Sequence, residues 1–220
     1  MTPYLHVCRL PAMTSSVKAD GPHGNTRQRL LDGFEKQLLD SGYLGISTAA
    51  LAEEVGIQRP SLYHHFPGGK EQLYSEVALR MIDTDAQRVA EALAVSDSLR
   101  PRLVALAMLH TTDPRRSALE QCIYDATRHV SDDTRTLVST RYVEDLLAPV
   151  NGMMREAVDS GELRDQDPDF LMNTFFGMAS AVQGIPEDVG MPPDKRGPRR
   201  RSARAAAERV VDLFLTGAAA

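Results

Sequence analysis

The segment from Ile46 to Lys70 constrains the fold more than any other part of this 220-residue chain. Its apolar residues recur at helical spacing on both sides of a central Gly-Ile-Gln at positions 56–58. Glycine ends a helix in the left-handed conformation without steric cost, and Pro60 falls where the first turn of a second helix tolerates proline. The segment is therefore predicted to form two short helices joined by a tight turn.

The first of these helices is expected to begin at Ser47 or Thr48, because a side-chain oxygen there can accept a hydrogen bond from an unpaired backbone N–H. Leu51, Ala52 and Val55 follow at the spacing of one buried stripe. This stripe predicts that the helix packs against its neighbours along one face.

The second helix, which begins near Arg59, divides into an apolar and a polar face. Leu62 and Phe66 lie four residues apart, so both are predicted to point inward. Arginine pairs with guanine and glutamine with adenine in the DNA major groove, and hydroxyl and imidazole groups suit phosphate oxygens. We therefore predict a DNA-binding face, with a helical hairpin that has a merely solvated face as the alternative. The outer residues are Gln58, Arg59, Ser61, Tyr63 and His64.

These residues resemble the tetracycline-repressor (TetR) family of bacterial regulators. The resemblance covers roughly Thr26 to Tyr74 and includes TRQRLLDGFEKQLLDSGY, LAEEVGIQRPSLYHHF and GGKEQL. The run PGGKEQLY is most similar to the branch of the family that represses multidrug-efflux genes. The resemblance implies an all-α fold with an N-terminal three-helix helix-turn-helix unit and a C-terminal helical body for ligand binding and dimerisation.

The resemblance also implies roles for single residues. Arg59 to His65 corresponds to the recognition helix, and Lys70 stands where a lysine grips phosphate. Gln58 and Pro60 replace a capping hydroxyl residue and a small residue, which bears on the operator sequence more than on the fold. The complete predicted DNA-binding set is Ser47, Thr48, Gln58, Arg59, Ser61, Tyr63, His64 and Lys70.

The composition allows such a protein and excludes other classes. The net charge of −5 is compatible with DNA binding, since nucleic-acid affinity depends on where the cations lie. No apolar run of about 18 residues is present, which predicts no membrane span. The stretch YLHVCRLPA is interrupted by Arg9, so it is not expected to be a signal peptide. Cys8 and Cys122 are then predicted to be free thiols in the cytoplasm.

No catalytic residue, metal site or cofactor is predicted. The chain contains no HExxH, GxSxG, Walker or GxGxxG element in a suitable context. His110 with Cys122, and Asp132 with Asp133, carry reactive groups, but nothing in their spacing requires them to meet within hydrogen-bond distance.

Elsewhere in the chain, the proline, glycine and capping residues that begin or end helices predict a series of helices without strands. We expect a disordered extension over residues 1–24, a DNA-binding domain over 25–69 and a regulatory and dimerisation body over 70–220. Pro149 is expected to kink or split the helix that contains it. The arginine-rich stretch around residues 195–204 is expected to be a solvated loop. Outside the helix-turn-helix the predicted helices are Thr26–Ser41, Lys70–Ala94, Pro101–His110, Ser117–His129, Ser131–Gly161, Phe170–Val182 and Ala203–Thr216.

The resemblance implies a ligand pocket in the body. Methionine adapts to varied apolar ligands, so the effector is expected to be an apolar small molecule, with ordinary core filling as the alternative role for each residue. The candidate pocket residues are Met108, Cys122, Tyr124, Met154, Phe175 and Met178.

The last two helices correspond to the family's dimer surface, where two subunits form a four-helix bundle. Two-fold symmetry would space the recognition helices about 34 Å apart, or a multiple of that, which predicts a palindromic operator. The candidate interface residues are Phe176, Val182, Val210, Phe214 and Leu215.

The sequence thus predicts a homodimeric regulator, a repressor released from double-stranded DNA by a small molecule. Two alternatives remain. One is a helical enzyme with a vestigial DNA-binding unit, and the other is a DNA-binding regulator that needs no ligand.

Overall fold

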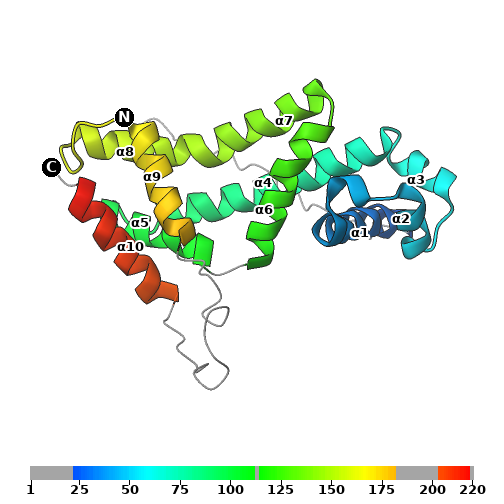
Figure 1. Ribbon diagram of the computed structural model, residues 1–220, viewed down its shortest axis with the longest axis horizontal. Helices are drawn as coiled ribbons and strands as arrows, with labels where there is room; N and C mark the ends of the chain where they lie inside the picture. The colour runs from blue at the N-terminus through cyan, green and yellow to red at the C-terminus, as the bar shows by residue number, and fades with distance from the viewer. Residues whose placement is uncertain (1–21, 112–113, 182–202, 219–220) are drawn as a thin grey trace, which may run out of the picture.

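The computed structural model describes residues 22–111, 114–181 and 203–218, and within these ranges the chain forms helices and no β-strand. The predicted all-α class is therefore confirmed. The molecule is elongated, with α1, α2 and α3 at one end and α10 at the other (Figure 1).

Residues 1–21 of the predicted disordered extension, residues 195–202 of the arginine-rich stretch and Val182 lie outside the described residues. Residues 22–24 were expected to be disordered but belong to the first helix, because that helix begins earlier than its sequence signals indicated. Arg204 lies in the last helix rather than in a loop, because that helix begins at Ala203.

Three helices make the N-terminal head: α1 (Pro22–Gly45), α2 (Thr48–Val55) and α3 (Arg59–His65). Helix α1 begins four residues before the predicted start at Thr26. The backbone of Gly42 is non-helical with φ 66°, so the regular part of α1 ends at Ser41, the last residue of the predicted range Thr26–Ser41.

The turn between α2 and α3 has the predicted chemistry. Ser47 caps α2, because its side chain accepts a hydrogen bond from the backbone N–H of Ala50 at 3.3 Å. Gly56 ends α2 in the left-handed conformation, with φ 74°. The N–H of Ile57 then donates to the carbonyl of Ala52 at 2.9 Å, which closes the turn.

The core of the head is built from the apolar stripes that the sequence predicted. Leu51 of α2 and Leu62 of α3 are fully buried, and so is Phe66, which follows α3. They join the stripe of α1, which consists of Leu30, Leu31, Phe34 and Leu38.

Helix α4 (Gly69–Leu93) runs from the head into the body (Figure 1). Arg80 of α4 pairs with Asp32 and Glu35 of α1, each at 2.7 Å. Arg27 of α1 also pairs with Glu76 of α4. These contacts hold α4 against the head, so a change in the position of α4 moves the helices of the head with it.

The body consists of the remaining helices, arranged around the far part of α4 (Figure 1). The helix α10 packs against α5 and α9. Within the described residues, no helix is long and apolar enough to cross a membrane. The body helices are α5 (Leu99–Thr111), α6 (Pro114–Ala126), α7 (Asp132–Tyr142), α8 (Ala148–Asp159), α9 (Pro168–Ala181) and α10 (Ala203–Ala218), with a 3₁₀ turn η1 (Thr127–His129) and a π turn η2 (Val143–Leu147).

Pro149 divides the long helix that the sequence predicted. Its ring nitrogen has no hydrogen to donate to the carbonyl one turn earlier. The structure accommodates this with the wider π turn η2, after which α8 begins at Ala148. The prediction of a kink or split at Pro149 is therefore confirmed.

Candidate nucleic-acid interface and ligand cavity

Helix α3 has the two faces that its spacing predicted. Leu62 is fully buried, whereas Arg59, Ser61, Tyr63 and His64 are exposed. Tyr63 is 39% exposed to solvent. The hydrophilic side of α3 is therefore available to a nucleic acid.

Tyr63 connects α3 to the start of α2. Its hydroxyl lies 3.5 Å from the hydroxyl of Thr48. The guanidinium of Arg59 donates to the same phenolic oxygen at 3.4 Å and lies 5.8 Å from the ring centre. The hydrogen bonds from Thr48 and then Arg59 lower the pKa of Tyr63. A continuous polar surface thus extends from the start of α2 along α3.

Gly69, at the start of α4, lies against the ring of Tyr63. Its φ of 60° falls in the left-handed region, and an added Cβ would lie 3.1 Å from Cε1 of Tyr63. Glycine at this position therefore allows the aromatic ring to lie close to the backbone of α4. This contact was not predicted from the sequence.

Lys70 lies at the junction of α1 and α4. Its ammonium group lies 4.5 Å from the ring centre of Tyr43, a cation–π contact. The side chain is half-buried, and this burial lowers the pKa of Lys70. The same tyrosine ring stacks on His129, with the ring centres 6.5 Å apart. Lys70 therefore has a packing role in the free protein, whatever it contacts on DNA.

For Ser47 and Gln58, two further residues of the predicted DNA-binding set, the structure shows exposure and position but few contacts. Ser47 is exposed and caps α2 as described. Gln58 is the N-terminal flanking residue of α3, and its side chain makes no capping hydrogen bond. Gln58 is exposed at the start of α3, and no described contact assigns it a further role.

The body contains a cavity of about 750 Å³, lined by residues of α4, α5, α6, α7, η2 and α9. This volume is within the range of sites for drug-sized molecules. Most of the wall is apolar and includes Met81, Leu106 and Ile123. Glu120 supplies a carboxylate, which accepts a hydrogen bond from the hydroxyl of Tyr142 at 3.1 Å.

One wall residue connects the cavity to the head. Ile123 of α6 lines the cavity, and its backbone carbonyl accepts a hydrogen bond from the hydroxyl of Tyr74 at 3.0 Å. Tyr74 is fully buried on α4, and burial, followed by the influence of Tyr43, raises its pKa to about 12. The rings of Tyr74 and Tyr43 meet edge to face at 5.5 Å. Contacts therefore run without a gap from the cavity wall to α1.

The profile of the family described as "Bacterial regulatory proteins, tetR family" matches residues 30–77. This match spans α1 to the first turns of α4 and contains the whole polar surface of α2 and α3. Over these residues the head of this protein is similar to the tetR family.

Two curated relatives extend the comparison. The chain is 34% identical over 71 residues to the HTH-type transcriptional regulator LmrA of Bacillus subtilis, covering 32% of this chain and 38% of LmrA. It is 27% identical over 164 residues to the HTH-type transcriptional repressor AcnR of Corynebacterium glutamicum, covering 73% of this chain and 81% of AcnR. The match to LmrA therefore spans much less than half of that protein, whereas the match to AcnR extends into the body.

The fold of the body also has solved counterparts. The structure titled "Crystal structure of AibR in complex with isovaleryl coenzyme A and operator DNA" superposes with a TM-score of 0.64 at 19% identity. The superposition covers 86% of this chain and 97% of that one. The head and the helical body thus share one overall fold with this solved protein.

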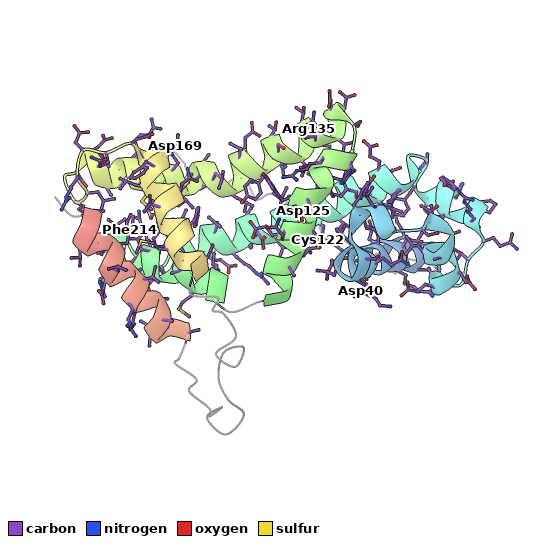
Figure 2. The ribbon with its side chains drawn as sticks, in the orientation of Figure 1. Asp40, Cys122, Asp125, Arg135, Asp169 and Phe214 are labelled. Carbon is purple, nitrogen blue, oxygen red and sulfur yellow. The ribbon has the colours of Figure 1, made fainter. Side chains whose placement is uncertain are left out.

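The wall of the cavity includes Tyr124 but none of the other predicted pocket residues. Met154 and Phe175 are fully buried in the core, and Met108 and Met178 pack against it. Cys122 lies near Asp125 on α6 (Figure 2), where burial and then this carboxylate raise the pKa of the thiol. The physical reason is the helical period: residues two apart, such as 122 and 124, project from nearly opposite sides of a helix.

The residues predicted for the dimer interface differ in their environment within the subunit. Phe214 of α10 is only 3% exposed and meets Phe175 of α9 edge to face, with ring centres 5.4 Å apart (Figure 2). Phe176 lines the cavity, and Val210 and Leu215 are half-buried. The exposed apolar residue of α10 is instead Leu213, at 67%, which the sequence analysis did not select. Its exposure depends on the packing of Phe214 inside the subunit, so the sequence contained no direct signal for it.

Proposed function

We propose that this protein is a homodimeric, sequence-specific transcription regulator that represses genes from a palindromic operator and releases the DNA when a small molecule binds. The observation that carries this proposal is the exposed polar face of α3, joined through Tyr63 to the start of α2 and supported from beneath by Leu62. This surface presents the groups that read base edges and hold phosphates in the major groove.

The body supports the ligand-dependent part of the proposal. The cavity has the size and apolar wall of a small-molecule site. Ile123 in its wall holds Tyr74 of α4, and α4 is fixed to the head through Arg80. A ligand that favours one position of α6 would therefore favour one position of the head.

Release requires that the ligand binds the two positions of the head with different affinity. A coupling free energy of about 1–3 kcal/mol would change operator affinity by about 5- to 150-fold. A regulator that needs no ligand would be expected to have a fully packed body. The cavity in the body therefore favours the ligand-dependent regulator over this alternative.

Two finer assignments belong to the same proposal. The run PGGKEQLY supports a place in the branch that represses multidrug-efflux genes. A regulator that binds the bacterial chromosome acts in the cytoplasm, which we propose as its location.

The decisive experiment selects bound fragments from random double-stranded DNA with the purified full-length chain. We expect enrichment of an inverted repeat with half-sites about one helical turn apart, or a multiple of that. The selection is then repeated with Tyr63→Ala, which removes the connection between α3 and α2. Recovery of unenriched DNA by the unsubstituted protein would overturn the proposed function.

A further inference from the structure

The formal charge on the described residues that line the cavity is negative. Glu120 is the acidic residue among the lining residues that the structure describes, and these include no lysine, arginine or histidine. The other polar lining residues are neutral, and the rest of the wall is apolar. An anion entering this cavity would meet a carboxylate without a compensating cation, whereas a cation would meet its counter-charge.

The carboxylate of Glu120 is positioned to bind a ligand. Tyr142 donates to one of its oxygens, Oε1, at 3.1 Å. Within the described contacts, Oε2 has no hydrogen-bond or ion-pair partner and lies in a half-buried side chain at the cavity wall. Apolar surroundings lower the local dielectric and strengthen the attraction between this oxygen and a positive charge.

Aromatic rings in the cavity wall also favour a positively charged ligand. Tyr124, Tyr142 and Phe176 all line the cavity. The faces of such rings attract cations through the ring quadrupole, by about 0.5–2 kcal/mol per contact. Carboxylate and rings together therefore favour a molecule that is apolar in bulk and positively charged at one group.

We propose that the effector of this protein is a drug-sized apolar cation and that Glu120 selects it over neutral and anionic molecules of the same shape. This inference rests on the proposed function only in naming the effector, since the cavity and its charge exist without DNA. The positive group lies against Oε2 of Glu120, and the apolar part lies against the wall formed by residues such as Met81 and Leu106.

The carboxylate of Glu120 also lies where the binding of a ligand in the cavity can affect the helices that contact the head. Its hydrogen bond with Tyr142 joins α6 to α7, and Ile123 lies one helical turn further along α6, where its carbonyl holds Tyr74. A cation that binds Glu120 therefore acts on the helix that contacts both α4 and the head.

The test uses two probes of nearly equal size and shape and opposite charge, tetraphenylphosphonium and tetraphenylborate. Their affinities for the purified full-length protein are measured by equilibrium dialysis without DNA. We expect the cation to bind about tenfold more tightly than the anion, or better. In Glu120→Gln, which keeps the shape but removes the charge, we expect the two affinities to come within about threefold of each other.

Two variants control the experiment. Glu144→Gln removes an equal charge from an exposed position on η2, next to a lining residue, and is expected to keep the full preference for the cation. Asp133→Asn removes an equal charge from an exposed position in the first turn of α7 and is also expected to keep the preference. Thermal unfolding of each variant verifies that it is folded.

Equal binding of both probes to the unsubstituted protein would overturn the inference, and so would a cation preference that survives in folded Glu120→Gln. Adding tetraphenylphosphonium to the protein on its selected operator separates this inference from the proposed function. A cation preference that depends on Glu120, without any change in operator affinity, upholds the charge selection by the cavity and overturns the release of DNA by its ligand.

Discussion

The hydroxyl of Tyr74 donates a hydrogen bond to the backbone carbonyl of Ile123 at 3.0 Å, in a fully buried position between α4 and α6. Tyr74 belongs to the helix that holds the head, and Ile123 belongs to the wall of the cavity. This bond thus joins the two parts of the protein that the proposed function must couple.

We predict that Tyr74→Phe lowers the free energy of unfolding by about 1 kcal/mol at pH 8, because the hydrogen bond to Ile123 is lost without change in ring volume. The same variant should weaken the effect of a ligand on operator affinity. Urea unfolding measures the first quantity, and a DNA-binding titration with and without ligand measures the second. Tyr124→Phe, at a tyrosine that is 60% exposed, serves as the matched control for the unfolding measurement alone, because Tyr124 also lines the cavity.

The stability difference between the unsubstituted protein and Tyr74→Phe should depend on pH. Burial raises the pKa of Tyr74 from 10.0 to about 12, so the folded state holds this proton more tightly than the unfolded chain. The stability from this group is therefore complete below about pH 10 and is lost as the pH rises toward 12. Phenylalanine does not ionise, so the difference should shrink over this range. A difference that stays constant from pH 8 to pH 12 would contradict the assignment.

We predict that Arg59→Ala costs about 1–3 kcal/mol of binding to the selected operator and relaxes the preference at one base pair. The reason is that its exposed guanidinium, held beside Tyr63, is geometrically suited to a guanine edge. Binding to operators with each single base substitution measures the effect. Equal losses on specific and random DNA would instead make Arg59 a backbone contact.

We predict that Lys70→Ala weakens binding to all DNA sequences and lowers the slope of log affinity against log salt concentration by about one unit, because one phosphate contact is lost. Lys36→Ala is the control, since that lysine already pairs with Glu54 at 2.6 Å. An unchanged slope in Lys70→Ala would leave Lys70 with its packing on Tyr43 as its role.

We predict that Leu213→Arg weakens dimerisation by about tenfold or more, because it places a charge on the exposed apolar side of α10. Leu44→Arg, at a side chain that is 71% exposed on the head, introduces the same charge away from α10 and should leave the dimer intact. Sedimentation equilibrium measures both. A Leu213→Arg protein that dimerises as tightly as the unsubstituted chain would exclude this face of α10.

The head was predictable in detail because its structure is set by local rules. The cap at Ser47, the left-handed Gly56 and the four-residue spacing of Leu62 and Phe66 each depend on neighbours close in the sequence. The helical period then decides which side of α3 is exposed. The contact of Tyr63 with Gly69 was not predictable, because it depends on the angle at which α4 leaves the head.

The body was predictable as a list of helices but not as a site. Methionines and aromatic residues mark apolar faces, and the sequence does not distinguish a face that fills the core from one that borders a cavity. Phe175 and Phe176 are neighbours in the chain, yet the first is fully buried against Phe214 and the second lines the cavity. Residues such as Glu120 and Tyr142, from α6 and α7, meet only after the helices pack.

The sequence by itself determined the helical class, the helix-turn-helix and the outward face of α3, since capping, glycine conformation and periodicity act within a few residues. Only the tertiary structure decided which side chains surround the cavity, that Lys70 packs on Tyr43, and that Tyr74 reaches Ile123. These relationships depend on the distances and rotations between whole helices, and such quantities are set by the packing of many side chains together.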